Sequence, residues 1–225
     1  MPNVSRLNRK RRELVSLMPK TGPFEKHSDR YDEWFERNRD VYNSELEAIR
    51  KLIPSPHAKG LEVGVGSGKF AVPLGIKIGV EPSDRMAAKA EKNGIRVFRD
   101  VAEDLPFSDS EFDFVLMVTT ICFVDDVQTS FKEAFRVLKT RGCIIVGFVD
   151  KESDLGKQYL DKRNTSVFYK EATFFSAQEV CQYLTDAGFR DLTLRQTLIP
   201  GEAQETIQDG FGKGAFVVAK GVKNS

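Results

Sequence analysis

Three glycines and an acidic residue in the stretch LEVGVGSGKFAVPLGIKIGVEP, residues 61–82, have the types and spacing that suit a nucleoside. Gly64, Gly66 and Gly68 alternate directly after an apolar run that predicts a buried strand. Glycines at this point allow a tight turn and bring backbone N–H groups close to a ligand. Glu81 ends the next apolar run, where a carboxylate can accept two hydrogen bonds from a ribose diol. The segment therefore predicts a site for a nucleoside-bearing cofactor.

The spacing of these residues separates two classes of cofactor. Dinucleotide-binding proteins carry G-x-G-x-x-G, in which the third glycine packs the helix against the strand. Here the pattern is G-x-G-x-G, and Lys69 stands where that third glycine would be. Glu62 lies two residues before the glycines, where an acidic side chain suits the ammonium and sulfonium charges of S-adenosylmethionine. The pattern favours S-adenosylmethionine over NAD.

The motif E-x-G-x-G-x-G at 62–68 resembles that of the class I S-adenosylmethionine-dependent methyltransferases. Three later segments resemble the same family in the same order: VAEDLPFSDSEFDFVLMVTTICFVDD at 101–126, FKEAFRVLKTRGCIIVGFVD at 131–150 and GAFVVAKG at 214–221. The resemblance covers roughly residues 28–221 and is strongest with the small-molecule branch that includes quinone-type C-methyltransferases. It implies an α/β fold, a doubly wound, mostly parallel seven-stranded sheet with an antiparallel terminal strand and helices on both faces.

The resemblance also implies which residues bind the cofactor, since ligands of open α/β sheets lie beyond the carboxyl ends of the strands. The Ala-acidic pair at 102–103 would border the adenine. Met86, one helical turn into the second helix, would pack on the adenine or else be an ordinary core methionine. The expected cofactor-binding residues are Glu62, Gly64, Gly66, Gly68, Glu81, Pro82, Ser83, Met86, Ala102, Glu103, Met117 and Thr119.

Two segments outside these motifs are expected to enclose the acceptor. Apolar and aromatic residues recur at helical spacing over 28–53, up to Pro54, and predict a helical region. The resemblance implies that this region is a cap, which would bring Tyr31 and Trp34 to the acceptor, with packing as their alternative role. Residues 151–174 are polar and lysine-rich, yet they carry aromatic side chains that include Tyr169. A connection this long predicts a lid, with a solvated insertion as the alternative.

The sequence assigns no catalytic residue. Relatives often carry Leu-His-His-Val after the fourth strand, whereas this chain has Ile-Cys-Phe-Val at 121–124. Cys122 is a candidate acceptor contact or nucleophile, although burial as a packing residue is the plainer interpretation. The Asp/Asn-Pro-Pro-Tyr/Phe motif typical of amine methylation of nucleic-acid bases or glutamine is absent. Asp125 and Asp126 adjoin, but they are better explained as the start of a helix than as metal ligands, so we expect no metal.

Composition limits the remaining possibilities. With 225 residues and 40% hydrophobic content, the chain suits one domain, expected at 28–221, preceded by a basic N-terminal extension at 1–27. The absence of a long apolar run or a secretion signal predicts a soluble, cytoplasmic protein without a membrane span. Three cysteines without a C-x-x-C pair fit a reducing compartment. A net charge of +1 argues against a nucleic-acid partner, and no oligomeric state is predicted.

The hypothesis that fits these patterns best is a methyltransferase that moves a methyl group from S-adenosylmethionine to a small molecule by in-line displacement. The alternative is a non-catalytic protein that binds or senses S-adenosylmethionine. An NAD-dependent oxidoreductase is disfavoured by Lys69 and by the lack of a Tyr-x-x-x-Lys pair, because the lysine after Tyr159 is Lys162, three residues on.

Overall fold

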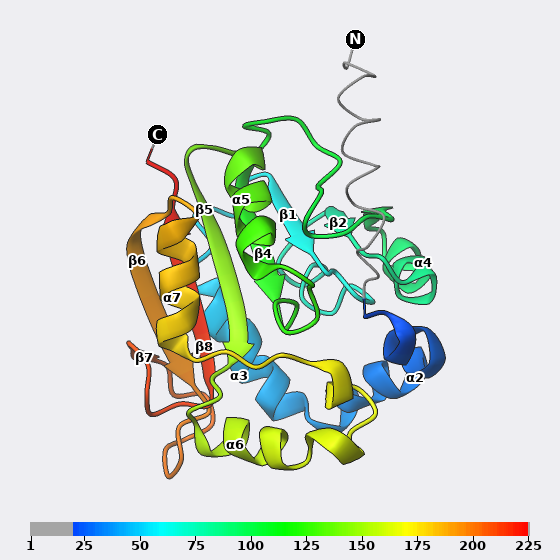
Figure 1. Cartoon of the computed structure of the whole chain (residues 1–225), viewed down its shortest axis with the longest axis vertical. Helices are drawn as coiled ribbons and strands as arrows, with labels where there is room; N and C mark the ends of the chain where they lie inside the picture. The colour runs from blue at the N-terminus through cyan, green and yellow to red at the C-terminus, as the bar shows by residue number, and fades with distance from the viewer. Residues whose placement is uncertain (1–19, 225) are drawn as a thin grey trace.

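The computed structural model describes residues 20–224, and within them eight strands form one sheet (Figure 1). The strands are β1 (Gly60–Val63), β2 (Ile78–Val80), β3 (Arg96–Phe98), β4 (Phe112–Val118), β5 (Leu138–Val149), β6 (Arg190–Thr197), β7 (Gln208–Asp209) and β8 (Phe216–Val222). Their order in the sheet is β3-β2-β1-β4-β5-β8-β6-β7. The first five are parallel, and β8 runs antiparallel to both β5 and β6. The prediction of a doubly wound, mostly parallel sheet is confirmed, and the short edge strand β7 adds an eighth member.

Helices cover both faces of this sheet (Figure 1). They are α2 (Gly22–Arg37), α3 (Arg39–Arg50), α4 (Asp84–Lys92), α5 (Val127–Val137), α6 (Asp154–Asp161) and α7 (Ala177–Asp186), with 3-10 turns η1 (Arg163–Thr165) and η2 (Tyr169–Glu171). One core cluster packs α5 and α7 on the sheet, and a second packs α2, α3 and α4 on the opposite face. Strand β4 serves both, since Val115 and Met117 enter the first cluster and Leu116 the second.

Two helices start at residues that the sequence indicates. Ser83 caps α4 by accepting a hydrogen bond from the backbone of Met86 at 3.3 Å, and Gly94 follows the helix with a φ of +83°. Ser176 and Glu179, which stand in the sequence as Ser-x-x-Glu, form a capping box at the start of α7. Such signals are local, so they do not depend on the rest of the fold.

Over the range of the expected helical cap, 28–53, the structure has two helices, α2 and α3. Helix α2 begins at Gly22, inside the range assigned to the N-terminal extension, and α3 begins after Asn38. The side-chain amide of Asn38 donates to the carbonyl of Trp34 at 2.8 Å, which closes α2 and lets the chain turn. The expected lid over 151–174 contains α6 and both 3-10 turns. Residues 1–19, with most of the basic extension, lie outside the described residues.

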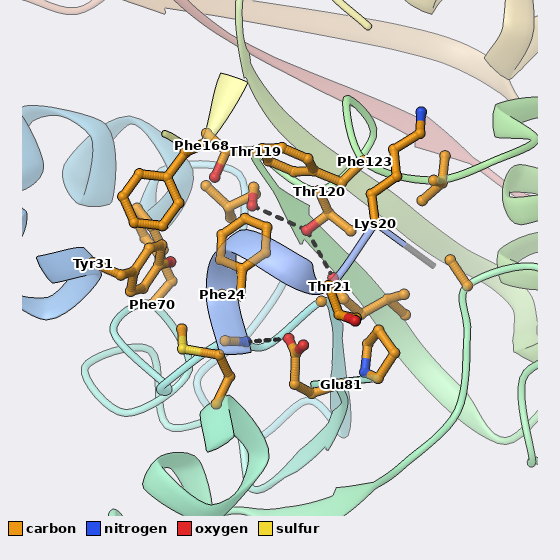
Figure 2. A pocket seen from close by; sticks show the side chains of 18 of the residues that line it. Lys20, Thr21, Phe24, Tyr31, Phe70, Glu81, Thr119, Thr120, Phe123 and Phe168 are labelled. Atoms are coloured by element: carbon orange, nitrogen blue, oxygen red, sulfur yellow. Dashed lines mark hydrogen bonds between the residues drawn. The ribbon is translucent and has the colours of Figure 1, made fainter. Parts of the chain in front are cut away.

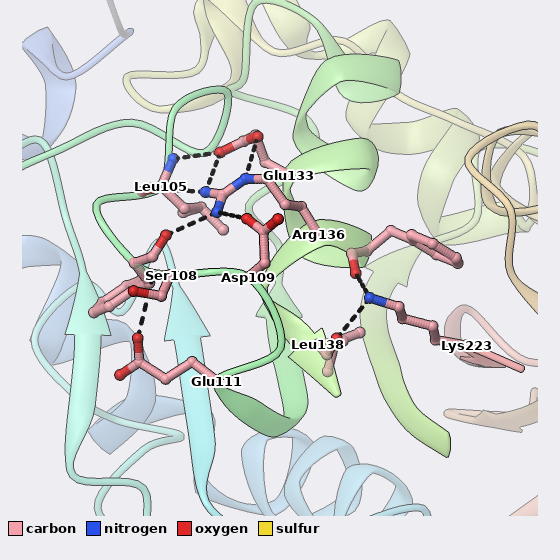
Figure 3. A network of polar contacts seen from close by, with 10 residues as sticks. Leu105, Ser108, Asp109, Glu111, Glu133, Arg136, Leu138 and Lys223 are labelled. Atoms are coloured by element: carbon pink, nitrogen blue, oxygen red, sulfur yellow. Dashed lines mark hydrogen bonds and ion pairs between the residues drawn. The ribbon is translucent and has the colours of Figure 1, made fainter. Parts of the chain in front are cut away.

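A polar network fixes the loop that connects β3 to β4 (Figure 3). The guanidinium of Arg136, on α5, donates to the carbonyls of Leu105 and Phe107 at 2.9 and 2.8 Å. The carboxylate of Glu133 accepts from the Leu105 backbone at 3.0 Å and forms an ion pair with Arg136 at 2.7 Å. Buried ion pairs of this kind hold a loop only when their remaining polar atoms are satisfied, as here. The network therefore anchors the loop at Leu105 and Phe107 to α5. No helix in the described part of the chain is long and apolar enough to cross a membrane.

Candidate functional site

A cavity of about 410 Å³ opens beyond the carboxyl ends of β1, β2 and β4 (Figure 2). Gly64 follows β1, Glu81 follows β2 and Thr119 follows β4, and all three line the cavity. Its volume falls in the range of roughly 300–1,000 Å³ typical of small-molecule sites. The opposite wall comes from α2 and from the 154–171 segment, which contribute the rings of Phe24, Tyr31, Trp34, Tyr159, Phe168 and Tyr169. Most of the predicted cofactor-binding residues, together with residues of the predicted cap and lid, therefore line one cavity.

Glu81 is the most constrained acidic residue in the wall. One of its carboxylate oxygens accepts from the backbone N–H of Gly66 and the other from that of Ser83, both at 2.9 Å. Burial raises its pKa to about 7, against the lowering effect of these two hydrogen bonds. Because an ionised carboxylate has about four acceptor positions, each oxygen keeps one that no backbone group uses. The carboxylate can therefore accept two further hydrogen bonds from a ligand in the cavity.

The three glycines of the motif all have positive φ, but they are needed for different reasons. A side chain at Gly64 would overlap Thr120, and one at Gly68 would lie 2.5 Å from Ile95. Packing alone therefore excludes side chains at these two positions. A Cβ at Gly66 would instead meet the hydroxyl of Tyr31 at 3.3 Å and the terminal methyl of Met86 at 3.5 Å. Gly66 is thus the glycine that leaves room between the loop and the cap.

Glu62 lies beneath this loop and is only 2% exposed. It does not line the cavity, and its Oε2 has no hydrogen-bond partner among the described residues. Burial raises its pKa well above the ordinary value, in spite of a hydrogen bond from the backbone of Ala71, and the charge of Glu81 adds to the increase. Burial is the largest cause of the raised pKa of Tyr31, and the charge of Glu62 is the second. A buried oxygen without a partner fits a site that receives a cation or donor from outside the protein.

The side of the cavity expected to bind adenine is lined by the predicted residues, and one of them, Glu103, also holds the start of a helix. Met86, Pro82 and Ala102 line the wall. The carboxylate of Glu103 also lies in the wall, and its Oε1 accepts from the backbone N–H groups of Asp125 and Asp126 at 2.8 and 3.1 Å. The side chain of Asp126 caps α5, as the sequence indicates. Glu103 therefore fixes the start of α5 beside the cavity.

Several predicted site residues lie outside the cavity wall. Met117 is fully buried in the sheet, Ser83 is engaged at the start of α4, and Gly68 packs under Ile95. Cys122 is also outside it, and its thiol donates to the carbonyl of Thr119 at 3.1 Å. Burial raises the pKa of this thiol to about 12, so it stays neutral at ordinary pH, as expected of a packing residue.

The aromatic rings of the cap and lid touch one another across the cavity (Figure 2). The ring of Phe24, on α2, lies 5.5 Å from that of Phe168 and 4.9 Å from that of Phe123. In the lid, Tyr159 and Tyr169 stack at 5.0 Å. These edge and stacked contacts are favourable arrangements for aromatic pairs. They close the cavity on the side opposite the glycine loop.

The structure draws attention to two residues of the cavity wall: Thr119, which was expected to bind the cofactor, and Glu45, which the sequence prediction missed. Thr119 has a φ of +49°, which is strained for a β-branched residue and typical of functional positions. Glu45, on α3, lines the cavity and is 6% exposed. Its signal was available, because it lies at helical spacing between Tyr42, Ala48 and Ile49 and so interrupts an apolar face.

Comparison with known proteins agrees with this geometry. Residues 61–146 match the family described as "Methyltransferase domain". The chain is 44% identical to the uncharacterized protein MJ1123 of Methanocaldococcus jannaschii, over 89% of this chain and 98% of that protein. It is 50% identical, with a TM-score of 0.86, to the crystal structure of a SAM-dependent methyltransferase, possible histamine N-methyltransferase, of Thermotoga maritima, covering 90% of this chain and 99% of that one.

The chain belongs to the class I S-adenosylmethionine-dependent methyltransferases. The predicted enzyme class and cofactor are confirmed, and the non-catalytic and NAD-dependent alternatives are set aside. The predicted likeness to quinone-type enzymes is also confirmed at low coverage. This methyltransferase is 35% identical to the ubiquinone/menaquinone biosynthesis C-methyltransferase UbiE of Rickettsia felis over 42% of its length and 46% of that enzyme.

Proposed function

We propose that this methyltransferase transfers the methyl group of S-adenosylmethionine to a small-molecule acceptor. The observation that carries the proposal is the position of the Glu81 carboxylate, with two acceptor positions unused by the backbone, in a cavity closed by aromatic rings. The glycine loop and Glu81 form the cofactor half of this cavity. Helix α2 and the 154–171 segment form the acceptor half.

The residues present fit the cofactor. Glu81 would accept the two hydroxyl groups of the ribose, and Met86 and Ala102 would border the adenine. The partnerless oxygen of Glu62 would attract the ammonium group and, more distantly, the sulfonium. The gap at Gly66 supplies the close approach to the backbone that such a ligand needs.

The acceptor half favours a small molecule over a macromolecule. The rings of Phe24 and Phe168 contact each other, and together with Tyr169 they line this half of the cavity. Tyr31, Trp34 and Tyr169 would contact the acceptor there. In this proposal residues 28–221 form one methyltransferase domain, in which 28–53 act as the cap and 151–174 as the lid.

The main task of the protein in this reaction is to align the acceptor with the methyl group and the sulfur of the cofactor. When bound, S-adenosylmethionine supplies an activated methyl group, which leaves sulfur as a nucleophile attacks in line. The cap and lid hold the acceptor in that line and exclude water, since proximity and orientation supply a large part of the rate enhancement for such transfers. The strained backbone at Thr119 would contribute to this positioning at the end of β4.

The acceptor class can be tested with methyl-labelled S-adenosylmethionine. The enzyme is incubated with an ultrafiltered cell extract, with the retained protein fraction and with the RNA fraction in separate reactions. We expect label in a molecule from the ultrafiltrate, together with S-adenosylhomocysteine in equal amount. Label that enters only protein or RNA would contradict the small-molecule proposal.

A further inference from the structure

Glu45 is an acidic residue of the cavity wall to which cofactor binding gives no role. Its side chain is 6% exposed, lines the cavity and makes no hydrogen bond or ion pair with the described residues. The helical turn that carries it is fixed, because the hydroxyl of the adjacent Ser44 donates to the carbonyls of Asp40 and Gln204 at 2.9 and 2.7 Å. A rigid turn thus presents a buried, unpaired carboxyl group to the cavity.

Tyrosine side chains from three other elements line the cavity together with this carboxyl group. Tyr31 comes from α2, Tyr159 from α6 and Tyr169 from η2, and all three line the same cavity. Burial raises the pKa of each hydroxyl, and the charge of Glu45 adds to the increase in all three. Tyr42, on α3 itself, is affected in the same direction, and its hydroxyl donates to the Lys69 carbonyl. The hydroxyl groups therefore stay neutral, and the rings of Tyr31, Tyr159 and Tyr169 share the cavity wall with Glu45.

A carboxylate among aromatic rings is suited to one kind of ligand group. Burial alone raises the pKa of Glu45 to about 8, since no basic partner lowers it. A bound ammonium would supply the missing counter-charge, and the faces of aromatic rings attract the same cation. An anionic or purely apolar acceptor would leave the carboxylate without compensation. Both features of the wall thus favour a basic nitrogen.

We propose that the acceptor is a small amine, and that Glu45 binds its nitrogen and takes up the proton that this nitrogen must lose. The proposal rests on the proposed methyl transfer. The carboxylate accepts one proton from the ammonium and so frees the nitrogen lone pair. That lone pair forms the new N–C bond while the C–S bond breaks, its electron pair remaining on sulfur. The proton on Glu45 then passes to solvent, which restores the carboxylate.

The cavity also contains basic side chains, which would suit an acidic acceptor instead. Arg30 and Arg37 line it but are exposed, and Arg37 is paired with Glu33. Lys20 is partly exposed. These groups keep contact with solvent, whereas Glu45 is buried, so the carboxylate has the greater need for a charged partner. An acidic acceptor is nevertheless included as an outcome of the test.

The test compares matched ligands on three forms of the enzyme. The ligands are 2-phenylethylamine, tyramine and tryptamine, with 2-phenylethanol and 3-phenylpropionate as oxygen counterparts. Their binding to the S-adenosylhomocysteine complex is measured by calorimetry, and methyl transfer from labelled S-adenosylmethionine by mass spectrometry. The enzymes are wild type, Glu45→Gln and the control Glu47→Gln, which alters an exposed residue of the same helix that pairs with Arg50.

We expect the amines, but not their oxygen counterparts, to bind and to be methylated on nitrogen by wild type and by Glu47→Gln. Glu45→Gln should lose about 10- to 100-fold in kcat/KM, the change expected when a hydrogen bond to a charged group is lost. Its affinity for S-adenosylhomocysteine should stay within about twofold of wild type, because Glu45 lies in the other half of the cavity.

The other possible results contradict either the amine proposal or the proposed methyl transfer. Preference for the alcohol or the carboxylate, or undiminished amine methylation by Glu45→Gln, would overturn the amine proposal. So would a wild-type enzyme that binds S-adenosylhomocysteine but neither binds nor methylates any amine, which would leave the proposed function intact. Failure of the wild type to bind S-adenosylhomocysteine would overturn the proposed function itself.

Discussion

Of the buried glutamates at the site, Glu81, Glu62 and Glu45 differ in what surrounds them. Glu81 accepts two backbone hydrogen bonds, Glu62 keeps one oxygen without a partner, and Glu45 has no hydrogen bond within the described residues. Burial raises the pKa of all three. Because an unpaired buried carboxylate destabilises the folded state, the presence of Glu45 in the cavity wall is best explained by a ligand.

The pH dependence of stability gives a prediction for Glu45 that is independent of catalysis. Its pKa is about 8 in the folded protein and 4.5 as an ordinary value. A carboxyl group whose pKa is raised by folding contributes fully to stability below its unfolded-state pKa. This contribution is lost as the pH rises through the pKa of the folded state. Replacing Glu45 by Gln, which stays neutral, removes this loss of stability at high pH. Glu45→Gln should therefore be about 2–5 kcal/mol more stable than wild type above pH 8.

Chemical denaturation near pH 5 and near pH 9 measures this difference, with Glu47→Gln as the control that should match wild type at both values. The gap between Glu45→Gln and wild type should be small near pH 5 and widen toward pH 9. A gap that does not change with pH would show that Glu45 is not buried as a free carboxyl group in solution.

At the scale of elements, α2 and the 154–171 segment are held over the cavity by specific contacts. The ammonium of Lys89, on α4, pairs with Asp29 and Asp32 of α2 at 2.7 and 2.6 Å. Asp32 also accepts from the hydroxyl of Ser67 in the glycine loop at 2.5 Å. The lid starts at α6, where Ser153 accepts from the backbone of Gly156 at 3.0 Å. Helix α2 and the 154–171 segment are thus anchored separately, and they contact each other through their aromatic rings.

Gly156 offers a direct test of how the lid is anchored. A Cβ at this position would collide with the backbone of Asp150 and Lys151. Gly156→Ala should therefore displace α6 and destabilise the protein by about 1–3 kcal/mol, as overpacking does. Gly22→Ala, in a helix with no neighbour within 4 Å, should leave stability within about 0.5 kcal/mol of wild type. Limited proteolysis should cut the 151–174 segment faster in Gly156→Ala alone, and equal rates in both variants would refute this anchoring.

Tyr169 tests the function of the lid. Its ring stacks on Tyr159 at 5.0 Å and lies parallel to Phe123 at 6.4 Å, and its side chain lines the acceptor half of the cavity. Tyr169→Ala should lower turnover of the acceptor about tenfold or more while leaving S-adenosylhomocysteine affinity nearly unchanged. Lys170→Ala, the exposed neighbour, serves as the control. Unaltered turnover would remove the acceptor role, and a large loss of cofactor affinity would assign Tyr169 to the cofactor half.

At the scale of the whole molecule, the sequence predicts what is local and misses what depends on distant contacts. The cap at Ser83 and the capping box at Ser176 are local signals and are correct. The split of the cap at Asn38 was not predicted, because it depends on a side-chain hydrogen bond rather than on a proline or glycine. Glu45 interrupts an apolar helical face, which the sequence shows, but only the folded chain brings this residue to the wall of the cavity.

The same distinction applies to the glycine motif. Its spacing predicts the cofactor class, yet it does not show that Gly64 and Gly68 are required by Thr120 and Ile95. Those contacts join the loop to residues far along the chain, which no local pattern reveals. The motif is therefore both a ligand loop, at Gly66, and a packing element of the sheet.

The central claim, that S-adenosylmethionine binds at the glycine loop through Glu81, is tested most directly by calorimetry with S-adenosylhomocysteine. The comparison uses wild type, Glu81→Ala and Glu91→Ala, the last being an exposed glutamate of α4 paired with Arg99. We predict tight binding by wild type and Glu91→Ala in preference to NAD, and a loss of about 1.5–3 kcal/mol, roughly 10- to 100-fold, in a folded Glu81→Ala protein. Unchanged affinity in that variant, or NAD binding in place of S-adenosylhomocysteine, would contradict the claim.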